Sequence, residues 1–390
     1  MTSVTVATRV DELLRGVPEW AELAADTAEP NVFYEPFVLL PAMEQLALGS
    51  DVRILFIRSD DDRLIGVVPL ERHRWSLAIP SPHFSMWRHR YCFLSTPILR
   101  SGFADAAVAA LFGWLDAAGG AGRFLQLPGH VGGGAFDRAV EASCGENNRF
   151  LRTTGGYDRP FVVAGLPPAR YLEATVPAKR RSELRRKRKR LGDLGEVAVV
   201  GASTQAELDL WLPRFLQLED RGWKGEAGTS IASGAKDRAF LQAVARRNGE
   251  RHRLELLALT LNGAPIAMAI SLRSAGAVFA FKIAYDEDYS AYSPGVQVEL
   301  EVLQRLLADP TTTWADSCAA SDYAAAPSTL WAERRVIREA ELVHASRFGR
   351  GLVAIGAPLQ GLAAATRAWM RGLPPSVQRP LRQLGAALRG

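Results

Sequence analysis

The chain has 390 residues, of which 48% are hydrophobic and 23% are charged, a composition typical of a folded globular protein. Its length favours two domains, and its three cysteines, Cys92, Cys144 and Cys318, lack C-x-x-C spacing and a neighbouring histidine cluster, which argues against a disulfide framework or a zinc site. The N-terminal residues include acids where a signal peptide needs an apolar stretch, and no apolar run reaches membrane-spanning length, so we expect a cytoplasmic protein.

The net charge of +5 conceals two basic segments in an otherwise acidic chain. Residues 179–190 contain nine basic residues and one acid, and residues 346–390 contain seven arginines and no acid. Because the rest of the chain is acidic and no nucleic-acid-binding module is evident, we do not expect nucleic acid binding as the main function.

Two segments about 200 residues apart predict the same supersecondary unit, which indicates an internal duplication. In each segment a helix precedes two strands joined by a turn. The first has a helix over 35–48 and strands over 52–58 and 64–72, and the second has a helix over 236–247 and strands over 254–261 and 265–273. The second turn contains Asn262-Gly263, the strongest short signal for a β-hairpin.

Between the two segments, a helix over 178–191 opens after Pro177 and ends at Gly192. Nine cations in twelve positions surround nearly the whole circumference of such a helix, so an ordinary amphipathic core helix is not expected. The helix should therefore face water or an anion, such as donor phosphates, tRNA, an acidic carrier protein or anionic lipid.

After the second hairpin, the sequence predicts a strand over 277–285, a polar loop over 286–295 and a helix over 296–307. Pro294 is suited to the first helical position, and Ser293 is placed to cap the helix. A strand over 311–318 is expected beside the strand over 277–285, which gives a mixed α/β sheet.

The C-terminal residues 346–390 form a basic tail in which arginines alternate with Leu, Ala and Trp369. This pattern is typical of an interfacial amphipathic segment, and we expect residues 350–390 to contact an anionic membrane peripherally at its inner face.

Four motifs together resemble the FemAB-like and CelD-like branch of the GNAT acyltransferases. They are KRRSELRRKRKRL at 179–191, GWKG at 222–225, KIAYD at 282–286 and YSPG at 292–295. The resemblance covers about residues 171–338 and is weaker in the N-terminal half.

The resemblance implies an α/β fold (an α+β mixed sheet) of two tandem GNAT-like acyl-CoA N-acyltransferase domains. Residues 1–165 would form the N-terminal GNAT-like half. Residues 166–345 would form the C-terminal acyltransferase half with its basic helix at 178–191, and residues 346–390 the amphipathic tail.

The resemblance also implies direct attack of an amine on an acyl thioester, without a covalent enzyme intermediate. Asp286 and Asp316 are the candidate bases, because both are expected near the ends of adjacent strands where the substrates would meet. Tyr289 and Tyr292 are candidate acids for the leaving thiolate, together with Tyr285.

Donor binding is expected at the start of the helix that follows the polar loop. There Ser293, Gly295 and Val296 would present backbone N–H groups and the positive helix end to phosphates. Lys282 is a second candidate, since a charge on an otherwise apolar strand needs an anionic partner. The remaining candidates come from the basic helix: Arg185, Arg186 and Lys189.

The identity of the acyl donor stays open, because the loop YSPGVQ at 292–297 departs from the Gln/Arg-x-x-Gly-x-Gly/Ala pattern usual in GNAT enzymes. Acyl-CoA or acyl carrier protein is the expected co-substrate, without a tightly bound cofactor or metal. Aminoacyl-tRNA is the alternative donor, and a non-catalytic scaffold on the same fold is the alternative to an enzyme.

The amine acceptor is expected in a cleft between the halves, with Trp223, Lys224 and Tyr285 as candidate contacts. A lipid or sphingoid amine and an envelope component are the two substrate classes that we retain, and the basic tail favours the lipid. The aromatic and basic segment 83–91 is expected to pack near this cleft.

Overall fold

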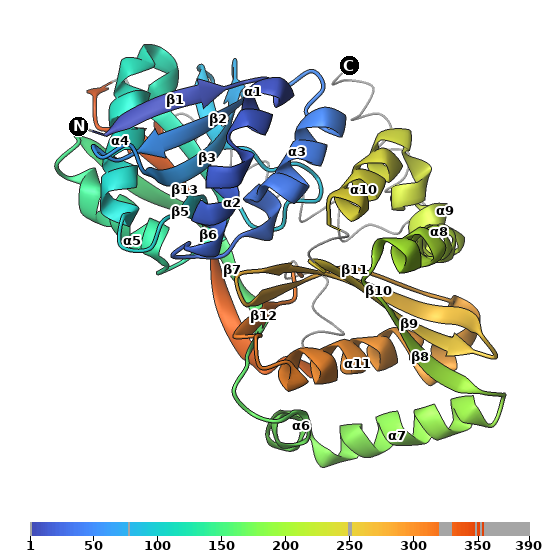
Figure 1. The fold of residues 1–390 in the computed structure, drawn as a ribbon. Helices are drawn as coiled ribbons and strands as arrows, with labels where there is room; N and C mark the ends of the chain where they lie inside the picture. Colours follow the sequence, from blue (N-terminus) through green and yellow to red (C-terminus); the bar gives the residue numbers. More distant parts are fainter. Residues whose placement is uncertain are drawn as a thin grey trace.

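Thirteen strands form one continuous sheet with helices on both of its faces (Figure 1). The computed structural model describes residues 2–76, 79–248, 252–319, 330–347, 349–351 and 353–354. The strand order is β1-β2-β3-β4-β6-β13-β7-β12-β11-β10-β9-β8, and β5 pairs with β3.

The N-terminal half contributes seven strands and five α-helices. Its strands are β1 (Ser3–Ala7), β2 (Asp51–Arg58), β3 (Leu64–His73), β4 (His83–Met86), β5 (Ile98–Leu99), β6 (Phe124–Val131) and β7 (Arg149–Val163). Its helices are α1 (Val10–Arg15), α2 (Val17–Ala25), α3 (Pro36–Gln45), α4 (Ala104–Ala117) and α5 (Ala135–Cys144), with 3-10 turns η1 (Val32–Tyr34) and η2 (Gly119–Arg123).

The C-terminal half repeats this plan. Its described strands are β8 (Val197–Ala202), β9 (Leu254–Leu261), β10 (Ala264–Ser274), β11 (Ala277–Tyr285), β12 (Trp314–Asp316) and β13 (Glu333–His344). Its helices are α6 (Pro168–Thr175), α7 (Ala178–Gly192), α8 (Gln205–Arg221), α9 (Trp223–Glu226), α10 (Ala235–Asn248) and α11 (Pro294–Ala308), with 3-10 turns η3 (Ile231–Ser233) and η4 (Glu287–Tyr292).

The predicted duplication is confirmed in the pairing of the strands. In each half an antiparallel run of three strands, β2-β3-β4 or β9-β10-β11, is followed by a helix and then by a strand parallel to the third. These helices are α4 and α11, and the parallel strands are β6 and β12. Both halves therefore have the same α/β plan.

The two halves are joined through long strands as well as through side chains. β7 pairs with β12 at its C-terminal end, and β13 returns from the C-terminal half to pair with both β6 and β7. The predicted boundary at residues 165 and 166 stays a prediction, and the return of β13 means that each half completes the sheet of the other.

Three large hydrophobic clusters among the described residues cover the faces of the sheet. α4 and α5 pack on one face of the N-terminal half. α6, α7 and α11 pack on one face of the C-terminal half. The third cluster lies between the halves and combines α1, α2 and α3 with α8, α10 and the neighbouring face of β9, β10 and β11.

Two predicted elements differ from the structure. The strand expected over 311–318 is shortened to β12, because the Asp309 carboxylate accepts hydrogen bonds from Thr311 and so forms a turn after α11. The polar loop expected over 286–295 contains η4 and the start of α11. Most of the predicted tail at 346–390 lies outside the described residues. No helix that the structure describes is long and apolar enough to cross a membrane.

Candidate functional site

A gap opens between β11 and β12, the two parallel strands of the C-terminal half. They pair only from Ala277 to Phe279 on β11 and from Trp314 to Asp316 on β12. β11 then continues to Tyr285 while β12 has ended. The two parallel strands therefore diverge beside the second half of β11, beyond Phe279.

The N-terminus of α11 follows this gap after the short turn η4. Pro294 has no N–H group, and the Gln297 N–H bonds the Ser293 carbonyl at 3.0 Å. Gly295 and Val296 therefore supply N–H groups that the helix does not use itself, at its positive end. A Cβ on Gly295 would lie 3.0 Å from Cδ1 of Tyr285, so glycine lets this ring approach the helix closely.

The basic helix α7 lies against the start of α11, which the sequence did not predict. Leu184 and Leu191 are seven residues apart and therefore share one side of α7, and both are buried with α11 in one hydrophobic cluster. The Gln297 amide donates a hydrogen bond of 3.2 Å to the Leu184 carbonyl, and Arg188 pairs with Glu301 at 3.6 Å. The expectation that α7 lacks a packing face was therefore wrong, because two leucines suffice to make one.

Ser293 binds a side chain of α7 instead of capping α11. Its backbone is left-handed, with φ of 53°, and its side chain forms no cap hydrogen bond. Its hydroxyl accepts a hydrogen bond of 2.8 Å from the Lys187 ammonium. The predicted cap is thus wrong, but Ser293 does bring a cation to the positive end of α11.

The other predicted cations of α7 point away from α11. Arg185, Arg186 and Lys189 are exposed and form no hydrogen bond or ion pair with any residue that the structure describes. Arg190 is also exposed, and its guanidinium lies 5.9 Å from the centre of the Tyr292 ring. The basic helix therefore has an inner row held by protein contacts and an outer row open to solvent.

A β-bulge places Lys282 on the face of the sheet opposite α11. The register of β10 and β11 shifts between Ile270 and Ser271, which leaves Phe281 as the extra residue of β11. Phe281 and Lys282 consequently both face the N-terminal half, where the Lys282 ammonium lies 5.0 Å from the centre of the Tyr91 ring. Lys282 and Ser293, predicted to bind the same donor, lie on different sides of the sheet.

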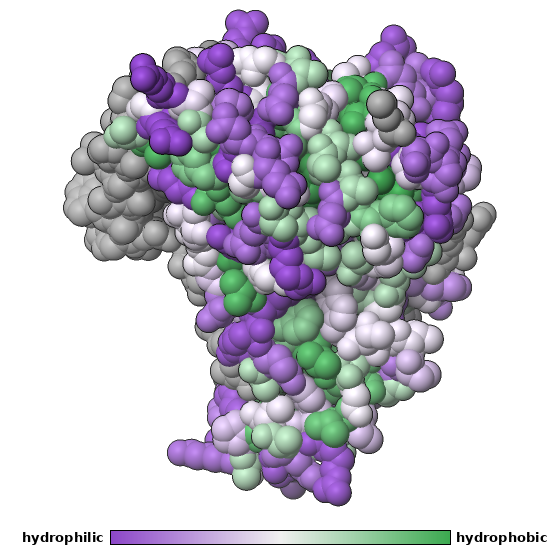
Figure 2. Space-filling model, turned by 90° about the vertical axis from the view of Figure 1, so that its left-hand side faces the viewer, coloured by the Kyte–Doolittle hydropathy of each residue, from purple (hydrophilic) through white to green (hydrophobic). Residues whose placement is uncertain are grey.

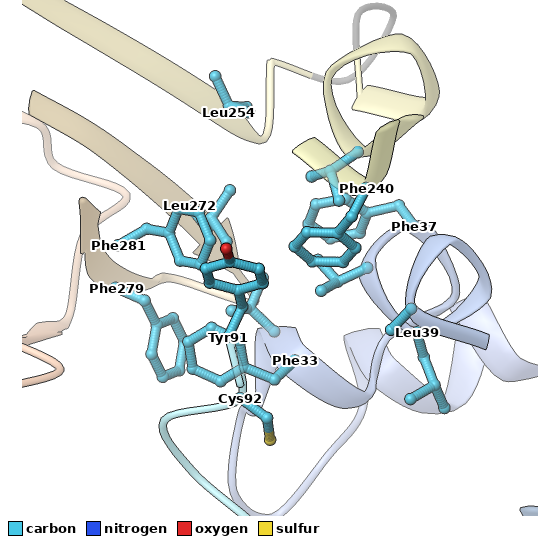
Figure 3. Packing of buried hydrophobic residues seen from close by; sticks show 14 of the residues in the cluster. Phe33, Phe37, Leu39, Tyr91, Cys92, Phe240, Leu254, Leu272, Phe279 and Phe281 are labelled. Carbon is cyan, nitrogen blue, oxygen red and sulfur yellow. The ribbon is translucent and has the colours of Figure 1, made fainter. Parts of the chain in front are cut away.

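The surface between the halves is packed where Lys282 meets it. Tyr91 stacks on Phe240 of α10 with ring centres 5.2 Å apart, and Phe33 contacts Phe279 at 5.5 Å. Figure 3 shows these rings together in one cluster. Burial and the nearby Asp237 carboxylate raise the pKa of Tyr91, and burial lowers the pKa of His89 to about 3. The expectation of packing for residues 83–91 is confirmed, and this packing limits how large an inter-half cleft can be here.

The candidate acids and bases of the polar loop lie on η4. Asp286 is half-buried, and its Oδ1 accepts a hydrogen bond of 3.0 Å from the Asp288 N–H. Tyr289 and Tyr292 are half-buried against the cluster that contains α11, on the donor side of the sheet. Tyr285 lies on the same side, against Gly295.

Asp316, the second candidate base, is fully buried at the end of β12. Its carboxylate pairs with Arg159 at 3.3 Å and with Arg335 at 3.4 Å, and it accepts the Cys318 N–H at 2.7 Å. These arginines were not predictable from the sequence, because they lie on β7 and β13 and reach Asp316 only through long-range strand pairing. These contacts stabilise the edge of the gap.

Trp223 and Lys224, the predicted acceptor contacts, lie on α9, which follows α8 after Gly222. Their side chains are outside the described part of the structure. No group of three or more His, Cys, Asp or Glu side chains among the described residues could hold a metal ion.

The equivalent gap of the N-terminal half is filled by the chain itself. β4 pairs in parallel with β6 only at Phe84 and Ser85, and the segment after β4 then follows β6. Ser95 bonds the carbonyls of Gly129 and Pro128, each at 3.0 Å, and the Thr96 hydroxyl accepts the Val131 N–H at 3.0 Å. This half therefore has no open place between its parallel strands.

The glycine segment 132–134, which precedes α5, lies against a carboxylate of the same chain, that of Glu29. The Glu29 carboxylate accepts the Phe136 N–H at the start of α5 at 2.9 Å, and a Cβ on Gly134 would lie 1.9 Å from its Oε1. Burial raises the pKa of Glu29. The N-terminus of α5 is thus already occupied by a carboxylate of the chain.

Comparisons with known proteins agree with this geometry. Residues 178–323 match the model of the acetyltransferase (GNAT) domain family. No curated protein matches the chain.

Solved structures share the fold over most of the chain at low identity. FemX has a TM-score of 0.55 with 10% identity, covering 83% of this chain and 95% of its own. A conserved protein of unknown function from Bacteroides thetaiotaomicron VPI-5482 has a TM-score of 0.55 with 11% identity, covering 85% and 97%. The C-terminal domain of a putative lysylphosphatidylglycerol synthetase from Agrobacterium fabrum has a TM-score of 0.52 with 11% identity, covering 89% and 96%.

Proposed function

We propose that this chain, whose residues 178–323 form a GNAT acetyltransferase domain, is an N-acyltransferase that moves an acyl group from a thioester to an amine. The fold is that of the GNAT acyltransferases, with FemX among the neighbours in structure. The donor is a thioester on a phosphopantetheine arm, either acyl-CoA or acyl carrier protein.

One observation supports this proposal most strongly: the gap beside β11 leads to the start of α11, where a cation is fixed. The free N–H groups of Gly295 and Val296 and the Lys187 ammonium, held on Ser293, together suit a phosphate. A phosphopantetheine arm has its phosphate at one end and its thioester at the other. With the phosphate at α11, the arm would follow the edge of β11 toward Lys282.

The reaction then needs one proton acceptor and one proton donor. The amine nitrogen attacks the thioester carbonyl, the C–N bond forms, and the C–S bond breaks. Asp286 accepts the amine proton through water, and Tyr289 protonates the leaving thiolate. Tyr292 directly precedes Ser293, at the phosphate end of the donor, and is therefore less suited to this role. Asp316 is excluded as the base in this scheme, because its carboxylate is buried and bound by two arginines.

Lys282 acts on the acceptor side of the sheet in this scheme. Its ammonium faces the N-terminal half, where it stabilises negative charge on the acceptor or on the carbonyl oxygen as that charge develops. The acceptor amine belongs to a lipid or to an envelope component, and the basic tail at 346–390 favours a lipid.

Thermal-shift measurements with acyl-CoAs of increasing chain length and with acyl carrier protein conjugates test the donor. The wild type should be stabilised by at least one thioester, and Gly295→Trp should lose that shift because its side chain would fill the start of α11. If no thioester stabilises the wild type or is consumed with an amine, the acyltransferase proposal is wrong. Transfer from aminoacyl-tRNA alone would identify the alternative donor.

Membrane contact through the tail is tested separately. Vesicles with anionic lipid should sediment the full chain and not a chain lacking residues 350–390. Equal sedimentation of both proteins would contradict the role proposed for the tail.

A further inference from the structure

We propose that the outer row of α7 is the docking surface for an acidic acyl carrier protein, which delivers the acyl donor to the gap beside β11. This inference rests on the proposed function, because it names the protein that would present the thioester arm. The outer row comprises five exposed cations: Lys179, Arg185, Arg186, Lys189 and Arg190.

The outer row is electrostatically unfavourable in the free protein. Arg185 and Lys189, and likewise Arg186 and Arg190, are four residues apart and therefore place like charges side by side on the helix. The first turn of α7 also has no acid, so its cations lie at the positive end of the helix. An anionic partner would relieve both repulsions.

The inner row of α7 has acids beside it, with Glu183 shared between two cations, whereas the outer row has no acid paired with it among the described residues. Glu183 pairs with Arg180 at 3.1 Å and with Lys187 at 3.3 Å, and Glu301 pairs with Arg188 at 3.6 Å. Hydrophilic side chains gather at the rim of the lower end of the molecule in Figure 2, the end where α6 and α7 lie in Figure 1. The cations left over therefore all lie on the side of α7 that faces solvent.

The length of the row suits a protein helix better than a nucleotide. From Lys179 to Arg190 the axis of α7 extends about 16 Å. The phosphates of one nucleotide cannot contact cations along that whole distance, whereas an acidic helix lying along α7 can.

The position of the row also suits delivery of a tethered arm. Lys187, between the exposed Arg186 and Lys189, reaches Ser293 at the start of α11. A carrier protein on the outer row would therefore have its phosphopantetheine phosphate close to the free N–H groups of Gly295 and Val296. The thioester could then enter the gap beside β11.

Binding of fluorescently labelled holo-acyl carrier protein to the full chain tests the proposal without an acceptor. In the variant R185E/R186E/K189E, affinity should fall at least about tenfold, as expected when charges in an interface are reversed. The matched control, K236E/R238E/R246E, makes the same change in net charge at exposed positions of α10 and should stay within about twofold. Raising the salt concentration should weaken wild-type binding, since the contacts are exposed.

Octanoyl-pantetheine lacks both the carrier protein and the nucleotide, so its binding measures only the site beside β11. It should bind the wild type and the two triple variants with equal affinity. The neutral variant R185Q/R186Q/K189Q and circular dichroism check that α7 remains folded. The inference is overturned if the wild type binds octanoyl-CoA but no carrier protein, if both triple variants lose carrier binding equally, or if the α7 variant loses aminoacyl-tRNA instead. If the wild type binds the carrier protein but no thioester, the proposed function is refuted, whereas the docking surface on α7 is still supported.

Discussion

The Lys187 ammonium donates a hydrogen bond of 2.8 Å to the Ser293 hydroxyl, and this contact joins the basic helix α7 to the first turn of α11. It fixes a positive charge beside the two N–H groups that α11 leaves unused. A phosphate placed there would meet a charge whose position is already determined, so that little side-chain entropy is lost on binding.

Replacing Lys187 by Met should weaken donor binding by about threefold to tenfold with little change in kcat, because the contact is to a part of the donor that does not react. Ser293→Ala removes the same hydrogen bond and leaves the charge, so its effect should be smaller. Chemical unfolding of both variants and the double variant should give a coupling free energy of about 1 kcal/mol. A coupling near zero would mean that the bond does not stabilise the contact of α7 with α11.

Gly295→Ala tests how closely the start of α11 is packed. The new Cβ would lie 3.0 Å from the Tyr285 ring, so overpacking should cost about 1–3 kcal/mol of unfolding free energy, against a gain of up to about 1 kcal/mol from helix propensity. In a Tyr285→Leu background the overpacking disappears and the same substitution should stabilise the protein. Equal effects in both backgrounds, measured by urea unfolding, would contradict the close contact.

The elements that were predictable from sequence are those with local signals. Two β-rich runs around Asn262-Gly263 predicted the hairpin of β9 and β10, and Pro294 predicted the start of α11. The duplication followed from repetition of the same pattern, and the resemblance of short motifs indicated the GNAT fold that the comparisons confirm.

The details of the site depended on contacts without local signals. The bulge at Phe281 reverses the side on which Lys282 lies, and a one-residue change of register has no signature in an apolar strand. The two arginines that bind Asp316 come from β7 and β13, whose pairing is set by the whole sheet. The packing face of α7 consists of two leucines among nine cations, so composition obscured it.

Substitution of Asp316 should lower the stability of the protein, whereas substitution of Asp286 should lower its activity. Asp316→Asn leaves the buried Arg159 guanidinium and the partly buried Arg335 guanidinium without this counter-charge and should cost about 3–5 kcal/mol of unfolding free energy. Asp286→Asn keeps the oxygen that accepts the Asp288 N–H, so its stability should stay within about 0.5 kcal/mol, while kcat falls about 10²-fold or more. Full activity of Asp286→Asn in transfer assays would remove Asp286 from the role of base.

Glu299 of α11 should make stability depend on pH. Burial raises its pKa to about 8, and the nearby Trp331 indole partly opposes this shift. Between its ordinary pKa near 4.5 and about 8, the folded protein holds a proton that the unfolded chain releases, so the free energy of unfolding falls as pH rises through this range. The full change is on the order of 5 kcal/mol.

Glu299→Gln should lack this dependence, because its amide stays neutral at every pH. In urea unfolding at pH 5, 6.5 and 8, the free energy of unfolding of the variant should increase relative to that of the wild type as pH rises. His89, whose pKa is lowered to about 3, destabilises both proteins as pH falls below about 6.5 and therefore cancels in this comparison. Parallel curves for the two proteins would show that Glu299 is ionised in the folded state.

Lys282→Met should impair the reaction with the amine acceptor, because the bulge turns the Lys282 side chain away from α11 and toward the N-terminal half. Donor affinity should stay within about twofold, whereas kcat/KM for the amine should fall more than about tenfold. The contact of the Lys282 ammonium with the Tyr91 ring contributes about 0.5–1 kcal/mol of stability. Urea unfolding of the variant checks that it remains folded. Lys187→Met is the matched control, because it removes the same charge on the donor side and should weaken the donor instead. If Lys282→Met weakens donor binding as much as Lys187→Met does, Lys282 binds the donor phosphate. In that case, the proposal that donor and acceptor bind on opposite faces of the sheet is wrong.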